Sequence, residues 1–201
     1  MNGIDVSHNN GTIDWTKVAA NPTKIDFAFI KASEGVGYTD PMFKTNANGA
    51  KNAGIRVGYY HFASLNTLNN VPDAKAEADY FMSLLKTVPA ADLPYVLDIE
   101  TNKVGLDPAH VQEWINTFFA EMKAGGYGNT ILYSYTPFLD SNLPHPHNLG
   151  NVRLWIAAYV SAPSPKLPQG WTQYYIWQKS STGSVSGING NVDMNVTLGP
   201  I

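Results

Sequence analysis

The stretch Phe27-Ala28-Phe29-Ile30 is wholly apolar, and polar residues follow it at Lys31 and Glu34. A strand that is apolar on both faces is covered on both sides, as in a parallel sheet flanked by helices. Seven further short runs have the composition of β-strands. With 27–32, they are residues 3–7, 56–62, 95–99, 130–134, 153–159, 174–178 and 190–194. The sequence therefore predicts eight strands in a parallel sheet.

Helical patterns lie between the early strands. The clearest begins at Asp107-Pro108, a capping residue followed by proline at the first helical position, and it ends at Gly125-Gly126. Its apolar residues repeat with a period of about 3.6, and they are Val111, Trp114, Ile115, Phe118, Phe119 and Met122. A second helix is predicted over residues 72–88, and weaker patterns cover 15–20 and 41–53.

The second half of the chain has a different character. Residues 136–152, 160–173 and 180–189 are rich in Pro, Gly, Ser and Asn and show no helical stripe, so we expect loops between the last strands. Eight strands with helices missing from the second half predict an α/β fold, a trimmed TIM-like barrel, as a single domain over residues 1–201. The alternative is an open doubly wound sheet, which would normally keep helices between all strands.

Composition excludes several classes of protein. Charged residues make up only 14% of the chain, and 13 basic against 16 acidic residues give a net charge of −3. No Lys/Arg cluster is present to support nucleic-acid binding. The chain has no cysteine, so disulfides, zinc-thiolate sites and thiol nucleophiles are excluded. It also has no apolar run of the roughly 20 residues that cross a bilayer, and its N-terminus lacks the features of a signal peptide.

The predicted strand ends are rich in polar and aromatic residues, and in such a barrel the C-terminal ends of the strands carry the functional groups. Carboxylates stand at or just after four of these ends, which is hard to explain as surface solvation. The acidic residues are Asp5, Glu34, Asp98, Glu100 and Asp193. The others are Lys31, Tyr59, Tyr60, His61, Tyr133, Tyr135, Trp155, Tyr159, Trp177 and Gln178.

The segment Leu97-Asp98-Ile99-Glu100 carries the central hypothesis. Residues two apart on a strand point to the same side, about 7 Å apart along the backbone, so Asp98 and Glu100 would both face a cleft. Two neighbouring carboxylates do not both ionise easily, so we expect one raised pKa. A glycosidase needs such an acid to protonate the leaving oxygen, while its neighbour stabilises the oxocarbenium-like transition state. The alternative is an acidic pair that caps a helix or binds a solvent cation.

Aromatic side chains and one histidine are further candidates. Sugar rings have apolar faces that stack on Tyr and Trp, and the candidates are Tyr59, Tyr60, Tyr133, Trp155, Tyr159 and Trp177. The alternative is that half of them belong to the barrel core. His61 is the best-placed histidine. The five histidines show no tight ligand spacing, so we expect neither a metal site nor a cofactor.

Several motifs resemble those of the family 25 glycoside hydrolases, which are N-acetylmuramidases. They occur in the family's order along essentially the whole chain, and they are Gly3-Ile4-Asp5-Val6-Ser7, Ile13-Asp14-Trp15, Phe29-Ile30-Lys31-Ala32-Ser33-Glu34-Gly35, 53–62, Leu97-Asp98-Ile99-Glu100 and 190–195. The resemblance implies a flattened (β/α)5β3 barrel. It also implies cleavage of the β-1,4 bond between N-acetylmuramic acid and N-acetylglucosamine in peptidoglycan.

The resemblance also implies roles for individual residues. Glu100 matches the general acid, and Asp98 matches the carboxylate that stabilises the intermediate or orients the substrate's acetamido group. Asp5 and Asp193 match the other two acidic positions around the cleft. Residues that match cleft-shaping or sugar-contacting sites are Lys31, Glu34, Tyr60, Tyr133, Trp155 and Gln178, to which His61 and Tyr159 are added from their places at strand ends. For the mechanism we favour assistance by the substrate's acetamido group, and an inverting route through a water stays open.

Two rival functions remain at this point. One is a peptidoglycan-binding or virion-structural barrel without catalysis, which the intact Asp98-Ile99-Glu100 disfavours. The other is a chitinase-like barrel, which usually carries a longer Asp-x-Asp-x-Glu array than residues 94–100 offer. We expect a monomer that acts on peptidoglycan glycan strands, without membrane insertion or nucleic-acid binding. The lack of a signal peptide fits a phage endolysin that is made in the host cytoplasm and released at lysis.

Overall fold

The computed structural model describes residues 1–65, 67–68 and 71–199. In chain order the elements are β1 (Asn2–Val6), the 3-10 helix η1 (His8–Asn10), α1 (Trp15–Ala19), β2 (Phe27–Glu34), β3 (Tyr38–Thr39), α2 (Phe43–Asn52), β4 (Arg56–Phe62), β5 (Thr67–Leu68), β6 (Val71–Pro72), α3 (Ala74–Leu85), β7 (Tyr95–Asp98), α4 (Pro108–Ala124), β8 (Thr130–Tyr135), α5 (Thr136–Asn142), β9 (Leu154–Ala157), β10 (Ile176–Gly183) and β11 (Val192–Thr197).

Eight strands close into a barrel in the order β1, β2, β4, β7, β8, β9, β10 and β11, and β11 pairs back to β1. The first seven are parallel to one another, as predicted. The prediction of a parallel sheet is wrong for β11, which is antiparallel to both β10 and β1. Because β1 pairs on both of its sides, the sheet has no open end there, which excludes the doubly wound alternative.

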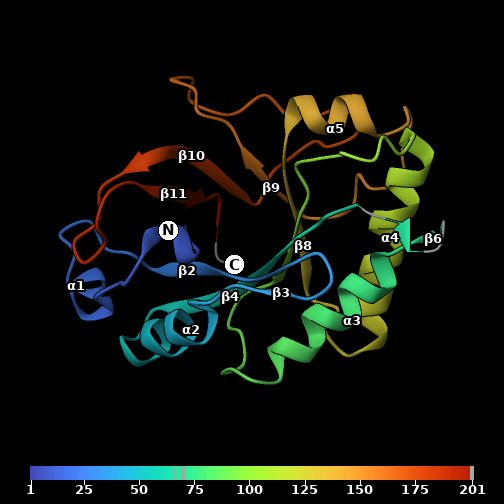
Figure 1. Ribbon diagram of the computed structural model, residues 1–201. Coiled ribbons are helices and arrows are strands. Elements are labelled where there is room, and N and C mark those ends of the chain that lie inside the picture. The colour runs from blue at the N-terminus through green and yellow to red at the C-terminus, as the bar shows by residue number, and fades with distance from the viewer. Residues whose placement is uncertain (66, 69–70, 200–201) are drawn as a thin grey trace.

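Helices follow the first five barrel strands, and within the described residues none separates β9, β10 and β11. The (β/α)5β3 arrangement that the family resemblance implies is therefore confirmed. Figure 1 shows helices α2 to α5 following one another around one side of the barrel, from α2 below to α5 above, while the orange and red strands carry loops instead. The alternation of strands and helices thus ends where the sequence becomes rich in Pro, Gly and Ser.

Two features of the second half differ from the sequence prediction. Helix α5 lies within residues 136–152, where only loop was expected, and β10 continues to Gly183, inside the predicted loop 180–189. Helix α5 has 7 residues and buries only Phe138 and Leu139, which is too short for a periodic apolar stripe. The far end of β10 is largely exposed and contains two register irregularities against β11, so its sequence lacks regular alternation.

Large aromatic side chains fill the barrel interior. Phe27 and Phe29 point inward from β2, and Gly3 and Gly58 on the neighbouring strands leave space for their rings. A Cβ atom at either glycine would lie 2.2 Å from the adjacent phenylalanine ring, far inside van der Waals contact. Trp155 packs on Phe29, with their ring centroids 4.6 Å apart. This packed interior fills the barrel below its mouth. It forms the floor of any cavity at the C-terminal ends of the strands.

A second apolar layer lies between the strands and the helices. Helix α4 begins with the Asp107 side chain accepting a hydrogen bond from the His110 amide, with Pro108 in its first turn, as predicted. Its predicted stripe is buried, except that Phe119 is only partly covered. Side chains that point out of the barrel strands meet these helices. Each strand therefore has an inward-facing and an outward-facing set of residues that alternate along it.

Candidate functional site

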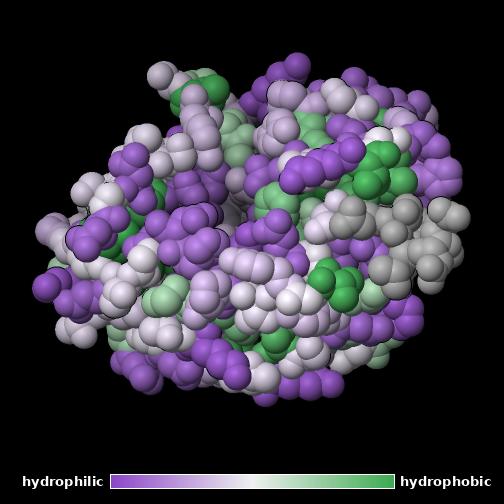
Figure 2. Space-filling model, viewed as in Figure 1, coloured by the Kyte–Doolittle hydropathy of each residue, from purple (hydrophilic) through white to green (hydrophobic). Residues whose placement is uncertain are grey.

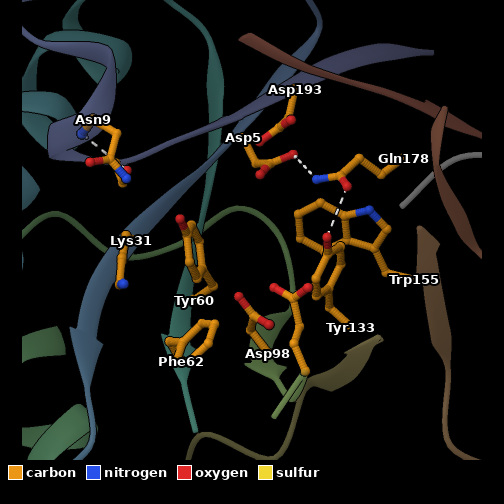
Figure 3. Close-up of a pocket in the computed structure, with 12 residues that line it drawn as sticks. Asp5, Asn9, Lys31, Tyr60, Phe62, Asp98, Tyr133, Trp155, Gln178 and Asp193 are labelled. Carbon is orange, nitrogen blue, oxygen red and sulfur yellow. Dashed lines mark hydrogen bonds between the residues drawn. The ribbon is translucent and has the colours of Figure 1, made fainter. Parts of the chain in front are cut away.

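A cavity of about 210 Å³ opens at the C-terminal ends of the parallel strands. Figure 2 shows a hollow in the middle of the viewed face, bordered mostly by hydrophilic surface. Figure 3 shows the side chains that converge on the cavity from opposite walls of the barrel. The lining residues are Asp5, Ser7, Asn9, Lys31, Tyr60, Phe62, Asp98, Glu100, Tyr133, Trp155, Gln178 and Asp193.

Strand alternation decides which residues reach this cavity. On β4, Tyr60 and Phe62 line it, whereas Tyr59 and His61 point outward into the layer beneath the helices. Along β7 the same period of two brings Asp98 into the cavity, and Glu100 follows it two positions later. The predicted common orientation of the two carboxylates is therefore confirmed.

The backbone that carries this acidic pair is fixed on both sides. The Asp98 carbonyl accepts a hydrogen bond from the Ala63 amide at 2.8 Å, and the Ile99 amide donates to the Tyr133 carbonyl at 3.0 Å. The Ser134 hydroxyl donates to the Ile99 carbonyl at 2.7 Å. Since both neighbouring strands hold the segment, its two side chains have a defined place in the cavity.

Burial governs the ionisation of the pair. Asp98 is only 7% exposed, and burial followed by repulsion from Glu100 raises its pKa well above the ordinary value. Burial also raises the pKa of Glu100, with a further increase from the charge of Asp193 and a decrease from its contact with Asp98. Two carboxyl groups in this setting share a proton.

A second acidic pair lies across the cavity. Asp5 of β1 and Asp193 of β11 are paired in the antiparallel register, and Figure 3 shows their side chains next to each other. Burial and then the charge of Asp193 raise the pKa of Asp5 to about 8, even though Asn195 and Gln178 donate hydrogen bonds to it. Burial raises the pKa of Asp193 as well. The reversed direction of β11 explains why Asp193, near the start of its strand, lies at the same barrel end as Asp5.

A chain of hydrogen bonds orients Asp5. Tyr133 and Tyr159 donate to the Gln178 side-chain oxygen at 2.8 and 2.7 Å, and the Gln178 amide donates to Asp5 Oδ2 at 2.9 Å. From the other side, Trp155 Nε1 donates to the Asn195 oxygen at 2.8 Å, whose amide donates to the same Asp5 oxygen at 2.7 Å. Every donor along both branches points toward Asp5, so the network favours negative charge at that oxygen.

Lys31 is the cation of the cavity. Its ammonium pairs with the Glu34 carboxylate at 2.7 Å and lies 4.9 Å from the Phe62 ring centroid. Its charge lowers the pKa of both Asp98 and Glu100, although less than burial raises them. Glu34 does not line the cavity and touches it only through Lys31.

The cavity continues in both directions along the barrel mouth. On one side a larger cavity of about 660 Å³ shares Glu100 and Tyr133 with it. On the other side a cavity of about 210 Å³ shares Asp5, Tyr60 and Asp193. Together they form a groove with the two acidic pairs at its centre.

The structure separates the predicted site residues into two groups. Within the groove lie all four catalytic candidates and Lys31, Tyr60, Tyr133, Trp155, Tyr159 and Gln178. Outside it lie His61, which is fully buried, and Glu34. The aromatic candidates Tyr59 and Trp177 are core residues, donating hydrogen bonds to the carbonyls of Pro89 and Ala158.

His61 is a structural residue. Its ring joins the Ser33 hydroxyl at 2.8 Å and the Glu77 carboxyl at 2.6 Å, and it stacks on Phe118. Burial and then the charge of Lys31 lower the pKa of His61 to about 3, so the imidazole is neutral. His61 was predicted as a site residue, but it is adjacent to Tyr60 on β4. Strand alternation therefore points its side chain away from the cavity that Tyr60 lines.

At the central cavity and the Asp5 network, sequence reasoning missed four residues: Ser7, Asn9, Phe62 and Asn195. Ser7, Phe62 and Asn195 are each two positions from a predicted site residue, so strict alternation would have found them. Among residues 1–65, 67–68 and 71–199, no group of three or more His, Asp or Glu side chains is arranged to hold a metal ion. Over the same residues, no helix is long and apolar enough to span a bilayer.

Comparison with known proteins gives consistent matches. The sequence profile of the family described as "Glycosyl hydrolases family 25" matches residues 4–188. The chain is 35% identical to lysozyme M1 of Streptomyces globisporus, over 97% of this chain and 67% of that protein. It is 31% identical to the autolytic lysozyme of Clostridium acetobutylicum, over 97% of this chain but only 55% of that protein. It is 30% identical to the N,O-diacetylmuramidase of Chalaropsis sp, over 96% of each chain.

The fold comparison agrees. The bacterial lysozyme from Streptomyces coelicolor superimposes with a TM-score of 0.85 at 34% identity, over 99% of this chain and 92% of that one.

Proposed function

This chain belongs to glycosyl hydrolase family 25, the lysozymes and muramidases that hydrolyse bacterial cell walls, and from this premise we propose which bond it cleaves and with which residues. The bond is the β-1,4 linkage between N-acetylmuramic acid and N-acetylglucosamine. Glu100 is the general acid, and Asp98 stabilises the positive charge that develops at the anomeric carbon. The observation that carries the proposal is the Asp98–Glu100 pair at the centre of a groove.

The shared proton explains how the two acids divide the work. In the substrate complex we assign it to Glu100, and the negative charge to Asp98. Positive charge that develops beside Asp98 favours the ionised form of that group, which is consistent with the shared proton being on Glu100. From Glu100 it passes to the glycosidic oxygen as the bond to the anomeric carbon breaks. A positioned acid of this kind contributes about 10²–10⁴-fold to the rate.

We propose that the substrate's own acetamido oxygen forms the new bond to the anomeric carbon. Two carboxylates on alternate positions of one strand need not reach the about 5–5.5 Å separation of a nucleophile–acid pair. Water then opens the cyclic intermediate, and the Glu100 carboxylate accepts its proton. The configuration at the anomeric carbon is retained in this route. Following the configuration of the first-formed product tests it, because an inverted product excludes acetamido assistance.

The two remaining acids support this chemistry from across the groove. Besides burial, the charge of Asp193 raises the pKa of Glu100, so Asp193 helps keep Glu100 protonated. Asp5 is held by the Gln178 and Asn195 amides, and we assign it to substrate contact at the groove wall. Tyr60, Tyr133 and Trp155 complete the walls on which sugar rings rest.

The proposed cleavage is tested on purified cell walls. The wild-type protein should clear a wall suspension and release fragments whose new reducing ends are N-acetylmuramic acid, as identified by mass spectrometry. The Glu100→Gln variant should lose this activity, while Glu113→Gln, which removes an exposed carboxylate on helix α4, should retain it. New N-acetylglucosamine reducing ends, or equal clearing by wild type and Glu100→Gln, would overturn the assignment. Digestion of chitin in place of peptidoglycan would favour the chitinase-like alternative.

We further propose that residues 1–201 act as one catalytic unit and as a monomer. A single closed barrel supplies every groove residue, so no second copy is needed to complete the site. Sedimentation equilibrium across a range of concentrations should return one chain mass. A dimer that dissociates together with loss of activity would contradict this proposal.

A further inference from the structure

The groove changes chemistry on one side of Glu100. The central cavity is lined by four carboxylates, one lysine and two amides, and most of its surface offers hydrogen bonds. The adjoining cavity of about 660 Å³ is walled largely by carbon, from Pro137, Ala157, Ala158 and Val160. Val160 is 49% exposed, so an apolar side chain faces solvent at the rim. We call this cavity the apolar pocket.

A sugar ring alone is an incomplete match for the apolar pocket. A sugar ring carries polar groups on most of its carbons and needs hydrogen-bond partners for them when it is buried. Seven lining residues of the apolar pocket carry polar side-chain atoms, but most of its exposed wall is carbon. Its volume is about three times that of the central cavity, 660 against 210 Å³. A bulkier and more apolar group attached to the glycan fits it better.

The substrate of the proposed function carries such a group. Each N-acetylmuramic acid bears a lactyl ether to which a short peptide is attached, and this stem peptide combines alanine methyl groups with free carboxylates. The peptide leaves the glycan at the muramic acid, beside the scissile bond. The apolar pocket likewise begins at the proposed general acid, because Glu100 and Tyr133 line both cavities.

One cation on the pocket wall complements the peptide's charge. Lys166 lines the pocket and is exposed, and within the described part of the chain its ammonium forms no ion pair. The other charged wall residue outside the catalytic pair, Asp140, already accepts a hydrogen bond from the Gln169 amide at 2.8 Å. Asp140 keeps its negative charge, so Lys166 is the wall residue of the apolar pocket that can pair with a peptide carboxylate.

The wall that carries Lys166 and Val160 is fastened to the barrel. The Thr136 hydroxyl donates to the Lys166 carbonyl at 2.6 Å, and Trp177 Nε1 donates to the Ala158 carbonyl at 2.7 Å. These bonds tie the segment between β9 and β10 to helix α5 and to the barrel. The segment projects at the top of Figure 1, and Figure 2 shows hydrophobic surface on its projecting tip. The pocket is thus largely preformed, which lowers the entropic cost of binding.

We propose that the apolar pocket binds the stem peptide of the muramic acid beside the cleaved bond, with Val160 contacting its alanine methyl groups and Lys166 pairing with a peptide carboxylate. This inference rests on the proposed muramidase function. It makes the protein selective for glycan strands that still carry their peptides.

The test uses two substrates prepared from one peptidoglycan. One is soluble, uncrosslinked glycan strands with their stem peptides, and the other is the same strands after an amidase has removed the peptides. Release of reducing ends gives kcat/KM for each. Wild type should prefer the peptide-bearing strands by about tenfold, a preference of the size that one good subsite gives. Lys166→Glu and Val160→Asp should each bring this ratio close to one.

Lys44→Glu is the matched control, because it reverses an exposed charge on helix α2, far along the chain from the pocket. It should keep the wild-type ratio. Equal kcat/KM of wild type on both substrates would overturn the inference, and so would a preference that survives in both pocket variants. Either result leaves the proposed function standing if bare strands are cleaved. Failure of wild type to cleave either substrate would instead overturn the proposed function and this inference together.

Discussion

Replacing Asp5 by asparagine should stabilise the protein at alkaline pH. The Asp5 side chain is only 9% exposed, and its pKa is raised from 3.8 to about 8, first by burial and then by Asp193. The unfolded chain releases this proton near pH 3.8 and the folded protein releases it near pH 8. Between these values the folded state binds more protons, so the free energy of unfolding falls as the pH rises. The loss is complete above pH 8 and absent below pH 4.

The size of the effect follows from the same shift. Each pH unit between the two pKa values corresponds to about 1.4 kcal/mol, so the full cost approaches roughly 5–6 kcal/mol. Asparagine keeps an oxygen that can accept from Gln178 and Asn195, and it adds an amide that can donate to Asp193. Because the buried amide has its own desolvation cost, we expect Asp5→Asn to recover about 2–4 kcal/mol at pH 8.5.

Thermal unfolding as a function of pH measures this directly. For a chain of this size the gain corresponds to roughly 5–15 °C in Tm at pH 8.5, shrinking toward zero near pH 4. Asp107→Asn is a control of opposite sign, since hydrogen bonds from His110 lower the pKa of Asp107. That variant should lose stability at neutral pH and approach wild type as the pH falls. A Tm difference for Asp5→Asn that does not depend on pH, or that becomes negative above pH 8, would refute the reasoning.

Three further variants separate catalysis from structure. Glu100→Gln should lower kcat by about 10²–10⁴-fold with little change in Tm, measured by reducing-end release and thermal unfolding, and a loss below tenfold would contradict its role as the acid. His61→Ala should lower the free energy of unfolding, measured in urea, by about 3–5 kcal/mol, because Glu77 and Ser33 lose their shared buried partner. A cost under about 1 kcal/mol would show that the network is dispensable. Tyr59→Phe should keep wild-type activity and lose about 1 kcal/mol, the value of its hydrogen bond to the Pro89 carbonyl, so a large loss of activity would place Tyr59 in the site.

Much of the fold could be predicted from the sequence because buried parallel strands leave a strong local signal. All eight predicted runs overlap barrel strands, and the cap at Asp107-Pro108 marks the true start of α4. The direction of β11 could not be predicted, since the composition of a short strand does not give the direction in which it pairs. Helix α5 was missed because two buried residues, Phe138 and Leu139, make no periodic pattern.

The candidate site could likewise be predicted only in part from the sequence. Proximity to the C-terminal end of a parallel strand located Asp5, Asp98 and Glu100 at one cavity, whereas Asp193 reaches it from the start of the antiparallel β11. Position alone was not enough where several candidates are consecutive. In Tyr59-Tyr60-His61 only the middle residue faces inward, and the sequence alone leaves the phase of the alternation open. The apolar pocket was not predicted, although Tyr133, Tyr135 and Tyr159 were candidates, because much of its wall comes from the short helix α5 and from the loop between β9 and β10.

The division of labour between Glu100 and Asp98 is tested most directly by a substrate that needs no proton. A dinitrophenyl glycoside of an N-acetylmuramic acid oligosaccharide has a leaving group that departs as an anion, so its release does not require a general acid. The initial rate of dinitrophenol release is the measurement. Glu100→Gln should recover most of the wild-type rate on this substrate, whereas Asp98→Asn should remain impaired because the cationic transition state still lacks its stabilising charge. If Asp98→Asn is rescued and Glu100→Gln is not, the assigned roles are reversed, and if Glu100→Gln stays inactive, it is not the proton donor.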